Sequence, residues 1–290
     1  MGKLRFFLIA LLFVGSSTYS QQKLLLYSDN IPGSKMKLNE EDQPTLEVYL
    51  PEKSTATGTA VIIFPGGAYS FIAYAEEGIA IARAFAKKGI ISFVVKYRLP
   101  KRQTMQDKSL GPLADAQQAM KVVRSKAREW NIDSKKIGVV GYSAGGHLAS
   151  TLGTHFKESY ISNVENISLR PDFMVLVYPL ISMRDSLTHM GSRIALLGIE
   201  PSKKKVEFFS NELQVNQETP PSYLTHTGDD SIVDVKNSII FYEALQKHCV
   251  DAELHLFPKG NHGFTQRLSL DEWINPILNF LRREGYYNQN

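Results

Sequence analysis

The sequence predicts a doubly wound α/β fold with a mostly parallel sheet and helices on both of its faces. Two observations indicate this class. Short apolar runs rich in β-branched residues alternate along the chain with segments of helical periodicity. The apolar runs are also nearly continuous, which is typical of strands buried on both faces of a parallel sheet. Such alternation implies right-handed crossover units, in which ligands bind at the carboxyl ends of the strands.

Six strands and four helices account for this alternation. The strands are expected at residues 60–64, 90–95, 137–140, 173–178, 223–226 and 253–257. Helices are expected at residues 77–88, 113–130, 235–248 and 272–283. The second of these helices has the clearest period, because its apolar residues recur at intervals of three and four.

Residues 182–221 interrupt the alternation with basic and polar stretches and two helix-like pieces. Because this segment lies between two expected strands, we interpret it as a small cap insertion over the strand ends, within a single domain that spans residues 21–290. An apolar fraction of 43% allows a substantial core. The only cysteine, Cys249, excludes an internal disulfide, so stability depends on that core.

Residues 1–20 have the pattern of a secretory signal peptide. A short basic start precedes an apolar run at 6–14 that is too short to span a bilayer, and small and polar residues follow up to Ser20. A buried N-terminal helix and an uncleaved anchor are the alternatives. Cleavage near Ser20 predicts a secreted or periplasmic protein whose mature form does not contact a membrane. Removal of Lys3 and Arg5 lowers the formal charge from +4 to +2, which argues against nucleic acid as a partner.

Glycines surround Ser143 in the stretch Gly141–Tyr142–Ser143–Ala144–Gly145, which satisfies the pattern G-x-S-x-G. The stretch follows an expected strand and opens an expected helix, the context in which this pattern exposes a nucleophile. A sharp turn brings the positions two residues either side of the serine too close to other backbone for a Cβ atom, which explains both flanking glycines. The alternative is a structural turn that happens to contain a serine.

Two loops offer backbone donors for an oxyanion next to this serine. The amide of Ala144 stands at a helix N-terminus, where free N–H groups and the helix dipole favour negative charge. Gly67, helped by Gly66 or Ala68, follows the strand at 60–64, and glycine lets the backbone turn its N–H groups into the site. A plain turn is the alternative for this second loop.

A serine hydroxyl is a weak nucleophile and needs a base, for which His262 has the best position among the seven histidines. It lies between Gly260 and Gly263 in a loop directly after the strand at 253–257. His147 is expected to point away from the serine along its helix. A loop histidine with no role is the alternative for His262.

The base needs an acid to orient it, and Asp229 and Asp230 both follow the preceding strand. Side chains one residue apart point differently, so only one of the two is expected to meet the histidine. The other is free to cap a turn or the helix that begins near Asp234. A calcium loop is disfavoured, because further oxygen ligands are missing.

These motifs resemble the α/β-hydrolase superfamily, and within it the secreted bacterial esterase and lipase branch that includes acetyl-xylan and feruloyl esterases. The resemblance extends from Leu46 to the C-terminus and is carried by residues 65–69, 95–100, 141–147, 229–233 and 260–264. It implies a catalytic triad of Ser143, Asp230 and His262, in the chain order of that superfamily. It also implies acyl transfer from an ester to the serine and then to water, with no metal or organic cofactor.

The resemblance selects Asp230 because the family's acid lies three residues before a Val-Pro pair, which here is Val233 followed by Asp234. The aspartate in place of that proline is one departure from the family. A second is Pro65, where many relatives have histidine, and it affects the expected shape of the oxyanion loop.

The resemblance favours an exported serine carboxylesterase that deacetylates xylan-derived or other acylated saccharides. An exported serine peptidase of the same fold and a non-catalytic binding protein are the alternatives. Glu76–Glu77 and residues 40–42 are interpreted as solvated charges, not as glycosidase carboxylates. Four side chains are candidates for substrate contact from their position in the sequence alone: Tyr69, Tyr142, Arg193 and Trp273. Aromatic faces suit sugar rings, although aromatic residues more often lie in the core.

Overall fold

The computed structural model describes residues 21–28, 30–40 and 42–288. The expected signal peptide at residues 1–20 lies outside these ranges. Within them, no helix is both long enough and apolar enough to cross a membrane.

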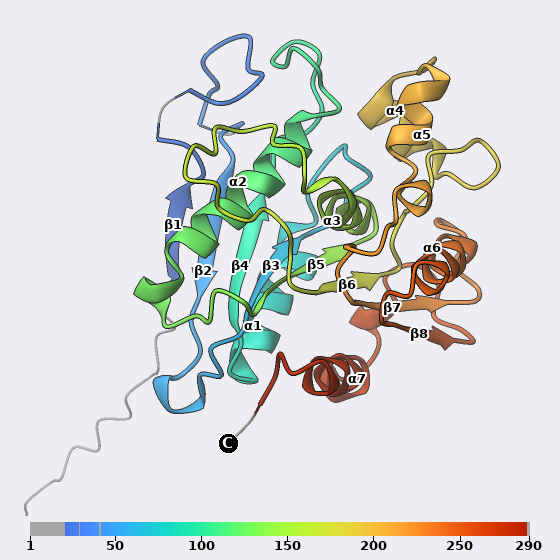
Figure 1. Cartoon of the computed structure of the whole chain (residues 1–290). Helices are drawn as coiled ribbons and strands as arrows, with labels where there is room; N and C mark the ends of the chain where they lie inside the picture. The colour runs from blue at the N-terminus through green and yellow to red at the C-terminus, as the bar shows by residue number, and fades with distance from the viewer. Residues whose placement is uncertain (1–20, 29, 41, 289–290) are drawn as a thin grey trace, which may run out of the picture.

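Among the described residues, eight strands form one sheet, and the six strands expected from the sequence are its parallel part (Figure 1). The strands that pair in parallel are buried or nearly so, except β8, whose side chains are half-exposed at the sheet edge. In spatial order the sheet contains β1 (Gln21–Leu25), β2 (Thr45–Tyr49), β4 (Ile91–Lys96), β3 (Ala60–Phe64), β5 (Ile137–Tyr142), β6 (Met174–Val177), β7 (Ser222–Thr227) and β8 (Ala252–Phe257).

The first two strands were not expected, and they pair antiparallel with each other and with β4. Charged side chains interrupt the apolar pattern of both strands: Lys23 on β1 lies opposite Glu47 on β2. A signal for β2 is nevertheless present: Leu46 and Val48 are apolar and alternate with polar neighbours, as in a strand that covers a core on one side.

Helices cover both faces of the sheet, as the sequence predicts (Figure 1). The apolar sides of α2 (Gly111–Ser125), α3 (Ala144–His155) and α6 (Lys236–Lys247) pack into the core on one face. The other face is covered by α1 (Ala80–Lys87) and α7 (Leu270–Arg283).

Two expected helices differ in detail from the observed ones. The segment 113–130 ends as an α-helix at Ser125 and continues as a 3-10 turn, Ala127–Trp130, which Asn131 closes in the left-handed conformation. The segment 77–88 begins with a π-helical turn, Tyr74–Ile79, ahead of α1. This turn places Glu77 in the interior, with consequences for the site.

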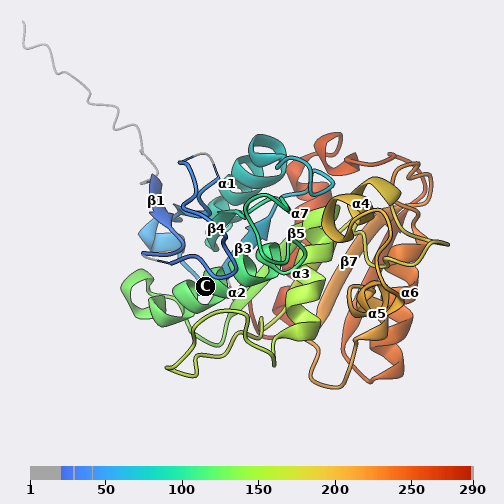
Figure 2. The same cartoon turned by 90° about the horizontal axis from the view of Figure 1, so that it is seen from above.

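The expected cap segment contains α4 (Met190–Leu197), α5 (Lys203–Phe208) and a 3-10 turn, Asn211–Leu213. Seen from above, α4 and α5 lie on the α6 side of the molecule (Figure 2). The segment also contributes His189 to the cavity above Ser143.

Candidate active site

Ser143 occupies the sharp turn between β5 and α3. Its backbone has φ 51° and ψ −118°, a conformation that L-residues rarely adopt. A Cβ atom on Gly141 would lie 2.4 Å from the carbonyl oxygen of Gly145, and one on Gly145 would lie 2.0 Å from that of Phe64. The expected reason for both glycines is therefore confirmed: the turn leaves no space for a side chain at either position.

His262 lies within hydrogen-bond distance of this serine, in the loop after β8. Its Nε2 is 2.9 Å from Oγ of Ser143. The loop bends through left-handed positions at Gly260, Asn261 and Gly263, which lets the ring reach back over the sheet edge. The neutral ring can accept the serine proton at Nε2 while its Nδ1–H points the other way.

The carboxylate of Asp230 meets that second nitrogen. Its Oδ2 lies 2.7 Å from Nδ1 of His262, and its Oδ1 accepts hydrogen bonds from the amides of Ile232 and Val233, both at 2.9 Å. Burial acts to raise the pKa of Asp230, but hydrogen bonds from His226, His262 and Val233 outweigh it and hold the pKa well below its usual range. The acid is thus an anion throughout the neutral range.

Asp229 has a different task. Its carboxylate accepts hydrogen bonds from the amides of Gly260 and Asn261, at 3.2 and 2.8 Å. It therefore holds the loop that carries His262, while Asp230 contacts the ring itself. The two neighbouring aspartates act on the same histidine from different sides.

The contact between His226 and Asp230 was not predicted from the sequence. His226 is a fully buried residue of β7 and places Nε2 3.1 Å from Oδ2 of Asp230 and 3.0 Å from the carbonyl of Val233. Both neighbours are acceptors, so Nε2 carries the hydrogen, and Ser238 donates its hydroxyl to Nδ1 at 2.8 Å. His226 is a positioning residue for the acid; its only signal in the sequence is a polar side chain at the end of a buried strand.

The oxyanion loop differs from expectation at one position. The amide of Gly66 donates to Oε2 of Glu77 at 2.6 Å, so it does not face an oxyanion. The correction leaves the amides of Gly67 and Ala68, which line the cavity above Ser143, and the amide of Ala144 at the start of α3. Gly66 is instead needed for proximity, because a Cβ atom there would lie 2.9 Å from Cβ of Ser143.

Glu77 is not the solvated charge that the sequence suggested. It is buried, and besides Gly66 it accepts the hydroxyl of Tyr178 at 2.9 Å. Burial raises the pKa of Glu77, against the opposing effect of these two hydrogen bonds and of His262. The ring of Tyr178 packs against that of His262, with 4.6 Å between the ring centroids. Glu77 therefore connects the oxyanion loop with the tyrosine that packs on the histidine. Glu76, its neighbour, is exposed as expected.

Tyr69 and His147 form a second buried connection behind the oxyanion loop. The hydroxyl of Tyr69 donates to Nδ1 of His147 at 2.8 Å, and Nε2 of that histidine donates to the carbonyl of Phe209 at 2.8 Å. Tyr69 is thus directed inward, and the expectation that it contacts substrate is wrong. The connection joins the oxyanion loop, α3 and the cap segment.

The other expected substrate contacts are also corrected. Tyr142 is fully buried and packs edge to face against Tyr178, in the core between the sheet and the helices α1 and α7. Trp273 is a core residue of α7 against Phe85. Arg193 is mostly buried and paired with Asp185.

A cavity of about 230 Å³ stands above Ser143. Its volume suits a small acyl group better than a long chain. The histidine of the cap segment, His189, forms one wall, and burial and the nearby His262 lower its pKa. The described residues around the cavity are Gly67, Ala68, Phe71, Ala73, Glu77, Ser143, His189, Ile232 and His262.

No group of three or more potential metal ligands is present among the described residues. Asp229, Asp230 and Asp234 each bind separate backbone amides, Asp234 that of Lys236. Each of the three carboxylates therefore has its own backbone donors.

Eight strands in this order, a serine on the elbow after β5, and an acid and a histidine after β7 and β8 define an α/β hydrolase. Within that class the chain belongs to the BD-FAE family, whose model matches residues 46–245. The family therefore covers the elbow, the oxyanion loop and the acid, whereas His262 follows the matched segment.

Several known proteins are similar to the chain. It is 34% identical over 233 residues to an acetylxylan esterase of Xylanibacter ruminicola, with 79% of this chain and 45% of that protein covered. It is also 34% identical over 224 residues to endo-1,4-beta-xylanase B of Butyrivibrio fibrisolvens, with 77% and 35% covered. The chain thus spans less than half the length of these two relatives.

A solved structure resembles the chain over almost its whole length. It is described as an acetyl ester-xyloside bifunctional hydrolase from Caldicellulosiruptor lactoaceticus. The two chains are 37% identical with a TM-score of 0.82, and 92% of this chain and 97% of that chain are covered.

Proposed function

We propose that the protein is a serine carboxylesterase that forms an acyl-enzyme on Ser143. One observation carries the proposal: Oγ of Ser143, the ring of His262 and the carboxylate of Asp230 are linked by hydrogen bonds of 2.9 and 2.7 Å. This is the nucleophile, base and orienting acid that ester hydrolysis without a cofactor requires. The named relatives, an acetylxylan esterase among them, support the same reaction.

In the first half-reaction, Oγ of Ser143 attacks the ester carbonyl while Nε2 of His262 takes its proton. Asp230 accepts the Nδ1–H bond, fixes the tautomer and stabilises the imidazolium that forms. The carbonyl oxygen becomes an oxyanion, which the amides of Ala144 and Gly67 stabilise. The imidazolium then protonates the leaving alcohol, and the C–O bond breaks to leave an acylated serine.

In the second half-reaction, water takes the place of the alcohol. Nε2 of His262 removes a proton from this water as it attacks the acyl carbon, and the same amides stabilise the second oxyanion. Collapse of that intermediate returns the proton to Oγ of Ser143 and releases the carboxylic acid.

We infer that the ester is an acetylated saccharide, such as a xylan fragment. The small volume above Ser143 suits an acetyl group, and the relatives named for xylan hydrolysis support a saccharide as the alcohol. The sugar would leave through the open side of the cavity, next to Phe71.

Hydrolysis of p-nitrophenyl acetate and release of acetate from acetylated xylo-oligosaccharides test the proposal. Replacement of Ser143 by alanine should lower both activities on the order of 10³-fold or more. Ser125→Ala, at an exposed serine of α2, is the matched control. Wild-type activity in Ser143→Ala would exclude the mechanism, and faster turnover of an aminoacyl amide than of the acetyl ester would favour a peptidase.

We further propose that the protein is exported through the leader at residues 1–20. The basic start and the short apolar run support this proposal. Expression of the full chain in a bacterial host, followed by mass determination of the product in the periplasm and medium, tests it. A product that starts near Gln21 in these fractions is expected, and a full-length product confined to the cytoplasm would contradict export.

A further inference from the structure

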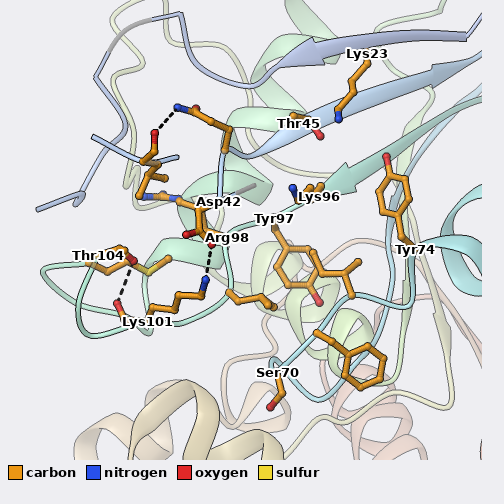
Figure 3. A pocket seen from close by; sticks show the side chains of 16 residues that line it. Lys23, Asp42, Thr45, Ser70, Tyr74, Lys96, Tyr97, Arg98, Lys101 and Thr104 are labelled. Carbon is orange, nitrogen blue, oxygen red and sulfur yellow. Dashed lines mark hydrogen bonds and ion pairs between the residues drawn. The ribbon is translucent and has the colours of Figure 1, made fainter. Parts of the chain in front are cut away.

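A second cavity, of about 490 Å³, lies beside the carboxyl end of β4 (Figure 3). It is lined by Leu38, Asp42 and Gln43, by the loop 70–74 and by the segment 96–105 after β4. It is large enough to hold a sugar unit, and the reaction proposed above does not use it.

Phe71 is the link between the two cavities, since it lines both of them. Phe71 is 59% exposed, so part of its ring is accessible to a ligand. A substrate with an acetyl group at Ser143 and several sugar units would pass over this ring into the second cavity.

The hydroxyl of Thr45 offers an unused polar contact in the second cavity. Thr45 is 3% exposed and lines the cavity, yet its Oγ1 has no hydrogen-bond partner among the described residues. A buried hydroxyl without a partner is unfavourable, so such groups are normally satisfied. A hydroxyl or carboxylate of a bound ligand would supply the missing partner.

Cationic side chains gather beside this hydroxyl. Lys23 and Lys96 line the cavity on the neighbouring strands, and Figure 3 shows both on the Thr45 side of it. The nearby carboxylate of Glu47 already accepts the hydroxyl of Tyr74 at 2.8 Å. Lys96 has interaction partners within the chain, so the exposed Lys23 is the cation that remains available to a ligand.

Two further cations that line the cavity form ion pairs. Lys101 forms an ion pair with Asp42, and Arg98 forms a buried ion pair with Asp115 at 2.8 Å. Among the described residues, Lys23 thus has no ion-pair partner, and it lies at the end of the cavity that contains Thr45. A ligand with a single carboxylate would balance it.

Part of the cavity wall is apolar. It presents a surface that suits the C–H face of a sugar ring and does not suit a strongly hydrated ion such as phosphate. The side chains of this wall are Leu38, Phe71, Ile72, Leu99 and Met105.

We propose that the second cavity is a subsite for a uronic acid unit of the acylated saccharide. The uronate carboxylate binds Lys23, a ring hydroxyl or the carboxylate itself bonds Thr45, and the ring face packs on the apolar wall. This inference rests on the proposed function for its substrate, but the binding site can be tested without turnover.

The first test is binding to the Ser143→Ala chain, measured by calorimetry with glucuronate, glucose and acetate. Glucuronate should bind roughly tenfold or more tightly than glucose, because a charge-assisted hydrogen bond distinguishes them. Equal affinity for glucuronate and glucose would overturn the proposal. Acetate binding as tightly as glucuronate would also overturn it and would indicate a site for any small anion.

The second test uses variants at the polar end. Lys23→Gln and Thr45→Val should each weaken glucuronate binding by roughly fivefold, an effect expected from the loss of one hydrogen bond. Lys203→Gln, whose side chain is 90% exposed on α5, is the matched control and should bind as the parent does. Unchanged affinity in Lys23→Gln would overturn the proposal, and since Lys23 is exposed, that variant should fold normally.

The third test separates this inference from the esterase proposal. In the active chain, Lys23→Gln should leave turnover of p-nitrophenyl acetate unchanged. It should lower kcat/KM only for acetylated oligosaccharides that carry a uronic acid. If uronate binds but no ester is cleaved, the proposed reaction fails and the subsite stands. If esters are cleaved and the uronic acid has no effect on binding or kcat/KM, the subsite fails and the reaction stands.

Discussion

The carboxylate of Glu77 accepts a hydrogen bond of 2.6 Å from the amide of Gly66, directly behind the candidate nucleophile. This contact fixes the direction of the peptide that leads into Gly67. The same carboxylate also accepts the hydroxyl of Tyr178, whose ring packs against His262. One buried group thus fixes the position of both the oxyanion loop and the tyrosine next to the histidine. Glu77 is therefore a positioning residue for two parts of the site.

Replacement of Glu77 by glutamine should lower kcat without a comparable change in KM. One amide group cannot accept from both Gly66 and Tyr178 with full strength, so the loop donors would lose their alignment in the transition state. We expect a fall of roughly tenfold to a hundredfold in kcat for p-nitrophenyl acetate, with KM within about twofold. Glu76→Gln, at the exposed neighbour, is the control, and equal kinetics of the two variants would contradict this role.

The adjacent aspartates make a second pair of matched variants. Asp230→Asn removes the charge that stabilises the imidazolium and should lower kcat on the order of 10³-fold to 10⁴-fold. Asp229→Asn keeps an oxygen that can accept hydrogen bonds from the amides of Gly260 and Asn261. Its kcat should therefore fall by less than about tenfold. Steady-state kinetics on one acetyl ester distinguish the two, and a greater loss in Asp229→Asn would reverse the assignment.

His226 provides a third prediction, because it holds Asp230 from the side opposite His262. His226→Phe removes the Nε2–H donor and should lower kcat by roughly tenfold while KM stays unchanged. His226→Gln retains a donor and should restore part of the loss, which a merely space-filling role would not explain. The half-exposed His248 supplies the control variant, His248→Phe. Full activity in His226→Phe would show that the acid does not need this contact.

The sequence alone predicted the parallel sheet and the loops that carry the candidate site residues. The strands at β3 and β5 are continuous apolar runs, so local composition identifies them, and the close approach of Gly141 and Gly145 follows from the elbow pattern itself. Candidate triad residues could be chosen because carboxyl ends of parallel strands meet at one edge. These features depend on short segments alone.

The remaining features depend on partners far away in the chain. Glu77 and Glu76 are chemically identical neighbours, and only the π-helical turn and the distant Gly66 and Tyr178 make one of them buried. Tyr69 similarly turns inward because His147 offers an acceptor. Such directions are set by tertiary contacts, so no local pattern could reveal them.

His147 leads to a prediction about stability against pH. Burial, which outweighs the hydrogen bond to the carbonyl of Phe209, lowers the pKa of His147 from 6.5 to about 4. Between pH 6.5 and about 4, His147 binds a proton in the unfolded chain but not in the folded chain. The free energy of unfolding therefore falls as the pH is lowered through this window. The difference corresponds to about 3 kcal/mol of unfolding free energy by pH 4. Thermal or urea unfolding of wild type and His147→Gln from pH 7.5 to 4 measures it: the variant should show a flatter decline, and His248→Gln should follow wild type. Parallel curves for wild type and His147→Gln would mean that His147 does not remain neutral in the folded protein.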